Sequence, residues 1–247
     1  MADDAQSSPF IKHLASSDKR TRDSALASLR AFLSSRSEIS ELDLLKLWKG
    51  LFYCLWMQDK PAQQQALSRS LASLPSSLKA PVVLPFLRAF WATIAREWTN
   101  IEALRLDKYL YLIRQYVNAS FRFLAANSWG NEEGIKQHGE IMAEFPLSAQ
   151  DTKIPNGLRF HVLDVWVDEL EKVEGEWRVE KRGVLEQLCA PVETLAKEGR
   201  LKVVRNAAKE TLGDERLRAW RGLVAEGGKE DADMEDDEEE EWGGIED

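Results

Sequence analysis

Lysine and arginine side chains lie next to tyrosines along two predicted helices, a combination that can hold a nucleic-acid strand. On the first helix, Lys46, Lys49 and Tyr53 recur at helical spacing and form a narrow polar ridge on an otherwise apolar surface. The polar face of the second helix carries a longer set, which consists of Arg105, Lys108, Tyr111, Arg114 and Arg122. Cationic side chains bind phosphates, and tyrosine rings stack on bases. Both ridges are therefore candidate contacts for RNA.

A further group of basic residues lies near the N-terminus and consists of Lys12, Lys19, Arg20, Arg22 and Arg30. Its first four members form a second candidate patch. An alternative explanation applies to all these sets, because carboxylates are close enough in sequence to pair with the cations. Asp23 is near Arg20, and Asp107 adjoins Lys108. Such ion pairs would stabilise the helices and leave little charge for a partner.

Residues that could catalyse a reaction or hold a metal do not cluster in the sequence. The chain has three well-separated histidines: His13, His138 and His161. No His or Cys pair has metal-ligand spacing, and no phosphate-binding loop or nucleophile elbow is present. Asp164, Asp168 and Glu171 share one helix face, which is interpreted as a solvated face instead of a ligand row. We therefore predict a protein that is not an enzyme and that takes no metal, cofactor or small-molecule substrate.

The helix that carries the first ridge is predicted to be buried on most of its surface. Its apolar residues form a broad stripe: Leu44, Leu45, Leu47, Trp48, Leu51, Phe52, Leu55 and Trp56. Ser40 with Asp43 predicts the N-cap of this helix, and residues 59–61 (Asp-Lys-Pro) predict its end. Such a helix suits the inner layer of a helical stack in which one edge remains open to a partner.

Apolar residues at helical spacing recur along almost the whole chain, and no segment alternates as a strand does. The predicted helices cover residues 9–15, 18–34, 41–59, 61–73, 81–99, 101–126, 132–144, 157–173, 183–197 and 201–212. The longest of them has two apolar faces and should lie between two neighbours, whereas the polar segment 146–155 predicts a loop. These features predict an all-α fold, a HEAT-like α-solenoid of roughly ten antiparallel helices over residues 1–225.

The charge of the chain is unevenly distributed. The 247 residues carry a formal net charge of −9, but residues 230–247 contain twelve acidic residues and no basic one. The rest of the chain therefore has 33 basic against 30 acidic residues, a charge of about +3. We predict that residues 226–247 form a disordered acidic tail, because this segment is too polar to fold alone. Trp242 and Ile245 leave open a short motif for a basic partner, although a solvating tail is the simpler interpretation.

The two cysteines, Cys54 and Cys189, lie far apart, each within an apolar helical pattern. This arrangement predicts buried, reduced thiols instead of a disulfide framework. The N-terminal segment MADDAQSSPF lacks the regions of a signal peptide, and no apolar run approaches the roughly 18 residues of a membrane span. The sequence therefore predicts a soluble intracellular protein that does not bind a membrane.

Long tryptophan-bearing segments occur in a characteristic order. They are LLKLWKGLFYCLWMQDKP (44–61), FLRAFWATIAREWTNIEALRLDKYLYLIR (86–114) and GLRFHVLDVWVDEL (157–170). Together with FIKHLASSDKRTRDSALASLRAFL (10–33), they resemble the eukaryotic ribosomal RNA-processing protein 1 family over roughly residues 9–212.

The resemblance implies a helical HEAT-like domain that serves as a non-catalytic assembly factor of the large ribosomal subunit. Such a protein would reside in the nucleus, in the nucleolus, and would dock on early pre-60S particles. It would be required to process spacer-containing precursor rRNA to 5.8S and 25S/28S rRNA. Its partners would be ribosomal proteins, other assembly factors and precursor rRNA. The contact candidates are then Lys46, Lys49, Tyr53, Arg105, Lys108 and Arg114, whereas the motif tryptophans are expected to pack in the core.

Two features qualify this interpretation. Some members of the family carry a long basic C-terminal extension, whereas this chain ends in acidic residues, so we expect the folded domain to be the docking element. A generic helical-repeat adaptor that binds a protein ligand outside the ribosome pathway would explain the same fold and the same lack of catalytic motifs. Association with rRNA would distinguish the two hypotheses.

Overall fold

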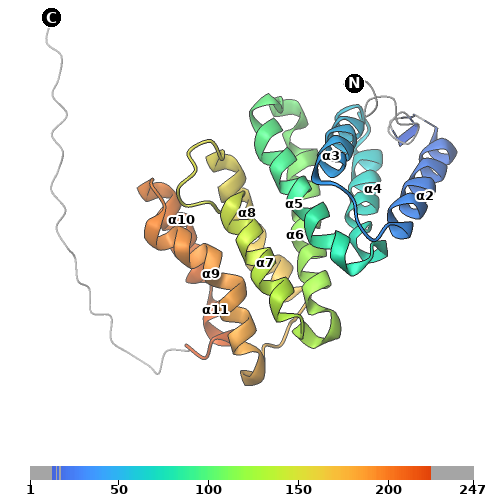
Figure 1. Cartoon of the computed structure of the whole chain (residues 1–247). Coiled ribbons are helices and arrows are strands. Elements are labelled where there is room, and N and C mark those ends of the chain that lie inside the picture. The colour runs from blue at the N-terminus through green and yellow to red at the C-terminus, as the bar shows by residue number, and fades with distance from the viewer. Residues whose placement is uncertain (1–12, 15, 17, 224–247) are drawn as a thin grey trace, which may run out of the picture.

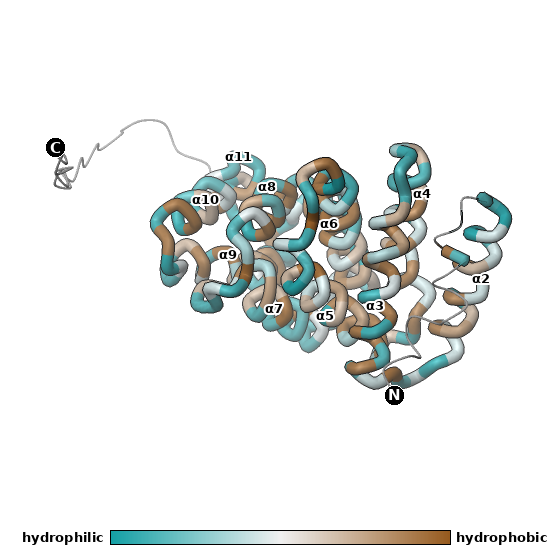
Figure 2. The backbone as a smooth tube through the Cα atoms, turned by 90° about the horizontal axis from the view of Figure 1, so that it is seen from above, coloured by the Kyte–Doolittle hydropathy of each residue, from teal (hydrophilic) through white to brown (hydrophobic). Residues whose placement is uncertain are grey.

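The computed structural model describes residues 13, 14, 16 and 18–223, and the regular elements of this part are all helical. The helices lie in two rows, which Figure 1 shows from the side and Figure 2 from above. The first row consists of α3 (Glu41–Trp56), α5 (Ala80–Glu97), α7 (Glu132–Glu144) and α9 (Arg182–Glu198). The second row consists of α4 (Pro61–Ala72), α6 (Ala103–Ala125), α8 (Asn156–Glu171) and α10 (Lys202–Leu212). Helix α2 (Lys19–Ser35) precedes the rows, and α11 (Glu215–Trp220) follows them.

Neighbouring helices within a row are two places apart along the chain. Thus α3 packs on α5, α4 on α6, α6 on α8 and α7 on α9. Short 3-10 helices join several of the elements: η1 (Pro75–Ser77), η2 (Trp98–Asn100), η3 (Ala126–Trp129) and η4 (Val179–Lys181). This is the arrangement of an α-solenoid, so the predicted all-α architecture is confirmed. Lys12, most of the predicted helix 9–15 and the segment 226–247 lie outside the described residues, and the domain boundary at residue 225 stays a prediction.

An aromatic cluster joins the two rows in the first half of the solenoid. The indole of Trp48 on α3 packs against Phe86 and Phe90 of α5 and against Tyr116 of α6, with ring centroids about 5 Å apart. Its Nε1 donates a hydrogen bond of 3.0 Å to the carbonyl oxygen of Phe86, and the Tyr116 hydroxyl donates one of 2.7 Å to Leu71. Buried polar atoms of these rings are therefore paired, which orients the helices as well as burying apolar area.

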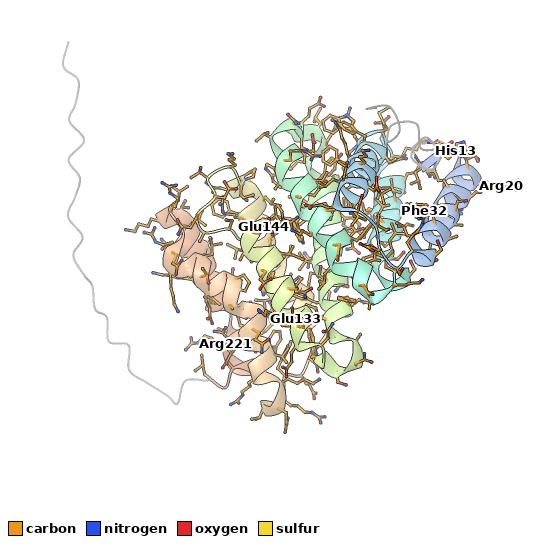
Figure 3. All side chains as sticks on the ribbon, in the orientation of Figure 1. His13, Arg20, Phe32, Glu133, Glu144 and Arg221 are labelled. Atoms are coloured by element: carbon orange, nitrogen blue, oxygen red, sulfur yellow. The ribbon has the colours of Figure 1, made fainter. Side chains whose placement is uncertain are left out.

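The first row is also held by an ion triad. Arg88 of α5 lies between α3 and α7 and forms ion pairs with Glu41 of the former and Glu144 of the latter. Its guanidinium also lies 5.3 Å from the centroid of the Phe145 ring. Figure 3 marks Glu144 on α7. One cation therefore connects three successive helices of the row.

The predicted helix boundaries are right where local residues set them. The Ser40 hydroxyl caps α3 by accepting a hydrogen bond from the Asp43 N–H, as expected. The end of α3, predicted at residues 59–61, falls at Trp56, whose carbonyl oxygen accepts hydrogen bonds from Arg105 and Lys108 of α6. Helix α11 is not predicted at all, since its six residues carry too little periodicity; Asp214 caps it by accepting from the Arg216 N–H.

The segment 146–155 forms the expected loop, but it is not simply solvated. The guanidinium of Arg159, which is buried, donates hydrogen bonds to the carbonyl oxygens of Ser148, Asp151 and Ile154. Leu147 packs into the core beneath the loop. The hydrogen bonds from the buried guanidinium of Arg159 therefore hold the loop 146–155 in one conformation.

Both cysteines are buried thiols that form no disulfide with each other, as predicted. Burial raises the pKa of the Cys54 thiol to about 12 and that of Cys189 to about 11. Both side chains are therefore neutral thiols that act as small apolar residues. Within residues 18–223, none of the helices is both long and apolar enough to cross a membrane.

His138 should make the fold sensitive to acid. Burial lowers the pKa of this side chain to about 4, whereas histidine in an unfolded chain titrates near 6.5. Between these values the unfolded state binds a proton that the folded state does not, so stability is retained above pH 6.5 and lost as the pH falls towards 4. We expect this group to cost about 3 kcal/mol over that range.

Urea unfolding at a series of pH values measures this effect. His138→Leu should remove the His138 component and give a flatter dependence between pH 6.5 and 4 than the unsubstituted chain. Parallel curves for the two proteins would contradict the prediction, because the remaining slope would then belong to other groups.

Candidate functional site

The three α3 candidates lie on one open stripe of the first row. Lys49 and Tyr53 are exposed and Lys46 is half-buried. Neither lysine forms an ion pair with another described residue. The exposed apolar side chains of Leu42 and Met57 continue the stripe at helical spacing. We call these five residues the α3 ridge, and its role as a partner contact stays a prediction.

Arg105 and Lys108 were expected to face a partner, but they bind the end of α3 instead. Lys108 is only 5% exposed, and its Nζ donates to the carbonyl oxygens of Trp56 at 2.7 Å and Gln58 at 2.9 Å. The Arg105 guanidinium also donates to Trp56 and stacks 4.9 Å from its ring centroid. The last carbonyls of a helix lack intrahelical partners and carry partial negative charge, so cations stabilise them. Lys108 is therefore not available to a partner.

The buried position of the Lys108 ammonium group lowers its pKa. Burial, together with the positive charge of Arg105, lowers the pKa of Lys108 to about 8, although the carboxylate of Asp59 opposes the shift. Two hydrogen bonds to carbonyl groups compensate the buried charge at pH 7.

Replacing Lys108 by methionine should therefore destabilise the fold. The substitution keeps most of the side-chain volume but removes the charged donor that the Trp56 and Gln58 carbonyl groups share, which leaves them only the hydrogen bonds from Arg105 and Gln64. We expect a loss of about 1–3 kcal/mol. Urea unfolding at pH 7 measures it, with the exposed Lys60→Met as the matched control. Equal stability of the two variants would mean that water replaces the ammonium at no cost.

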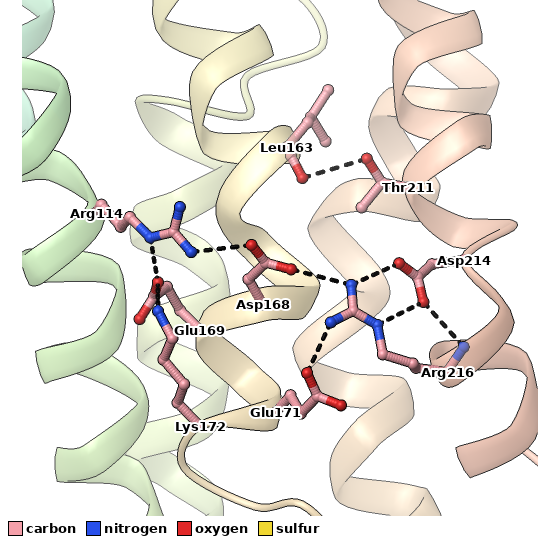
Figure 4. Close-up of polar contacts among 9 residues, drawn as sticks. All are labelled: Arg114, Leu163, Asp168, Glu169, Glu171, Lys172, Thr211, Asp214 and Arg216. Carbon is pink, nitrogen blue, oxygen red and sulfur yellow. Dashed lines mark hydrogen bonds and ion pairs between the residues drawn. The ribbon is translucent and has the colours of Figure 1, made fainter. Parts of the chain in front are cut away.

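Arg114 belongs to a polar network between α6, α8 and α11, drawn in Figure 4. It forms ion pairs with Asp168 at 2.9 Å and with Glu169, whose side chain is 2% exposed. Arg216 of α11 binds Asp168 at 3.0 Å and Glu171 at 2.7 Å. Asp168 and Glu171 thus bind an arginine of a neighbouring helix, so the prediction of a solvated face holds for the exposed Asp164 and only in part for these two carboxylates.

The network also explains the titration of its central carboxylate. Partial burial raises the pKa of Asp168, but hydrogen bonds from Arg216 and Arg114 outweigh this effect and hold the pKa below its usual value. Arg114 therefore joins two helices, and little of its charge remains for RNA.

The second candidate patch lies on α2 and is only partly open. Lys19 is paired with Asp23 at 3.0 Å, and Arg22 donates to the carbonyl oxygen of Ser16 at 2.8 Å. Arg20 is exposed at the outer edge of the molecule, as Figure 3 shows. Lys12 is outside the described residues. The patch stays a prediction, carried chiefly by Arg20.

The structure reveals a basic groove that the sequence interpretation did not identify. It lies between α4, η1 and α6, has a volume of about 600 Å³, and is called here the α4–α6 groove. Arg69 and Arg122 line it together with Ser76, Gln115 and Asn118, and none of its lining residues is acidic. Its apolar lining residues include Pro75, Leu78 and Phe123.

A signal for this groove was present in the sequence. Residues 60–96 and 108–131 contain no aspartate or glutamate, although acidic residues are frequent elsewhere in the chain. These two segments form the walls of the groove. Most basic residues within them have no carboxylate within a helical turn, whereas those near Asp23 or Glu102 do. The signal is incomplete, because Arg96 pairs with the adjacent Glu97, and Arg88 and Arg114 bind carboxylates of other helices.

The described residues do not assemble a metal centre. No group of three His, Cys, Asp or Glu side chains among them could hold an ion. His161 lies 2.8 Å from the carbonyl oxygen of Leu110, and His138 is in the core. The absence of catalytic activity nevertheless stays a prediction.

These features define a class of protein: a helical solenoid that presents extended binding surfaces on a well-packed framework. The chain belongs to the family described as "Nucleolar protein, Nop52", which matches residues 5–246. The resemblance noted from the tryptophan-bearing segments is thereby confirmed.

Several similar proteins are named as ribosomal RNA processing protein 1 homologues. The chain is 40% identical over 173 residues to human ribosomal RNA processing protein 1 homolog B, which covers 68% of this chain and 23% of the relative. It is 40% identical over 170 residues to mouse ribosomal RNA processing protein 1 homolog A, an alignment that covers 66% of this chain and 34% of the relative. It is 34% identical over 174 residues to the Drosophila melanogaster homolog, an alignment that covers 68% of this chain and 25% of the relative. The chain thus matches about a quarter to a third of the length of these relatives.

Proposed function

We propose that this chain is a non-catalytic scaffold in ribosomal RNA processing that acts in the nucleolus. The observation that carries the proposal is the family match over residues 5–246, supported by relatives named as ribosomal RNA processing proteins. More specifically, the solenoid docks on early pre-60S particles through ribosomal proteins and other assembly factors. It is then required for the conversion of spacer-containing precursor to 5.8S and 25S/28S rRNA.

The geometry supports scaffolding because the two rows of helices are tied together by buried groups. The Trp48 cluster connects the two rows, and the Arg114 network connects α6, α8 and α11, so the helices that carry the exposed side chains keep fixed relative positions. The α3 ridge combines exposed apolar groups with lysines that have no ion-pair partner in the described part of the chain, a combination typical of macromolecular contacts. A rigid surface of this kind can hold a precursor in one arrangement while other proteins cleave it.

Affinity purification of the tagged full chain from nuclear extract tests this function. We expect enrichment of spacer-containing large-subunit precursor rRNA together with large-subunit proteins. A stable complex with one protein and no rRNA would instead support the helical-repeat adaptor outside the ribosome pathway.

The same assay tests the docking role of the α3 ridge. Lys46→Glu with Lys49→Glu should remove most of the recovered precursor, because both lysines lack an ion-pair partner among the described residues. Lys136→Glu with Lys197→Glu makes the same change of charge at exposed positions on α7 and α9. Equal recovery by both double variants would place the docking surface elsewhere.

A further inference from the structure

We propose that the α4–α6 groove binds single-stranded RNA, with Arg69 and Arg122 holding phosphates at its rim. This inference rests on the proposed role in rRNA processing and names the surface that touches the RNA. Of the basic residues that the sequence analysis named on this helix, the groove includes Arg122 but not Arg105, Lys108 or Arg114, and it adds Arg69 of α4.

Three cationic side chains lie at the groove. Arg69 and Arg122 line it, and Arg30 reaches its wall at Ser73. None of the three forms an ion pair with another described residue. By contrast, the guanidinium groups of Arg88, Arg114 and Arg216 each bind two or three carboxylates. The groove is therefore a site of unneutralised positive potential on a mildly basic part of the chain.

Neutral neighbours hold these cations in place. Arg69 donates to the Tyr111 hydroxyl at 3.1 Å, and Arg122 donates through Nε to the Asn118 side-chain oxygen at 2.7 Å. Arg30 donates to the Ser73 hydroxyl at 2.6 Å. A guanidinium has further N–H donors beyond the one used in such a contact, and these suit the paired oxygens of a phosphate. The arginines are thus positioned without losing the capacity to bind an anion.

The lining of the groove favours a nucleic-acid strand over a simple anion. Leu78 and Phe123 also line the groove, and these half-buried apolar side chains can contact the faces of unstacked bases. Ser76 and Gln115 add neutral donors and acceptors for base edges or ribose hydroxyls. An acidic peptide would use the cations but would leave these apolar surfaces without a complementary partner.

The direct test measures RNA binding by the purified full chain. Fluorescence anisotropy with a labelled single-stranded RNA of about 12 nucleotides, a length that spans a groove of this kind, gives Kd across a salt series. Arg69→Gln with Arg122→Gln should raise Kd about 20-fold near 100 mM salt and lower the slope of log K against log salt by about 1.4, because two phosphate contacts are lost. Arg178→Gln with Arg218→Gln, two exposed arginines elsewhere, should change Kd less than about twofold.

Three outcomes would overturn the inference. The first is no salt-dependent binding by the unsubstituted chain, and the second is an equal loss in both double variants. The third is displacement of the RNA by polyglutamate as effective as by unlabelled RNA, which would make the groove a site for acidic peptides. Circular dichroism melting confirms that each variant is folded, since the substituted side chains are exposed.

Purification of precursor particles separates this inference from the proposed function. If the unsubstituted chain recovers precursor rRNA from extract but binds no RNA when pure, the scaffold role stands and the groove inference fails. If the Arg69/Arg122 variant loses RNA binding in vitro but still recovers particles, the groove inference holds and docking uses other surfaces as well.

Discussion

Trp48→Ala should lower the free energy of unfolding by about 3–5 kcal/mol, the largest effect of any single substitution considered. The indole is fully buried and lies at the point where α3, α5 and α6 meet. Removing it loses transfer free energy, leaves a cavity between the two rows, and deletes the hydrogen bond to Phe86. A close-packed interior cannot relax enough to fill such a space.

Thermal and urea unfolding followed by circular dichroism measure this loss. Leu104→Ala is the control, because the Leu104 side chain is 99% exposed and should change stability by no more than about 0.5 kcal/mol. A loss below about 1 kcal/mol for Trp48→Ala would mean that the rows close over the cavity. The result also matters for function, since loss of particle association in a Trp48 variant would report unfolding and would not identify a contact.

Local sequence predicted the helices well because their determinants are local. Periodic apolar residues located nearly every helix, and the Ser40 cap fixed the start of α3. The end of α3 could not be predicted in this way, because Arg105 and Lys108 arrive from another helix to bind its carbonyl groups. The six-residue α11 was missed for a similar reason, since its position depends on the contacts of Arg216 with α8.

The candidate site was harder to predict because the charge of a residue does not reveal its partners. Arg114 and Arg122 are two turns apart on α6 and are equivalent in the sequence pattern. In the fold, Arg114 faces the carboxylates of α8, whereas Arg122 faces α4 and η1, which supply none. Only the packing order of the helices decides which cation is neutralised. Both arginines lie in the acid-free segment 108–131, so the distribution of acidic residues does not separate them either.

Arg114→Ala should therefore act on stability and not on RNA binding. It leaves the nearly buried Glu169 with Lys172 as its remaining cation, and it removes one of the two arginines on Asp168. Breaking a buried ion pair from one side costs about 3–5 kcal/mol, and because Lys172 still pairs with Glu169 we expect about 3 kcal/mol here.

A double-mutant cycle with Glu169→Gln identifies the cause. If the cost arises from an uncompensated buried carboxylate, Arg114→Ala combined with Glu169→Gln should be more stable than Arg114→Ala alone, as judged by urea midpoints. RNA affinity of the folded fraction should stay within about twofold of the unsubstituted chain, because Arg114 contributes little free charge. A stable Arg114→Ala protein with weakened RNA binding would reverse the assignment, making Arg114 a ligand contact and the α8 face of α6 part of the RNA surface.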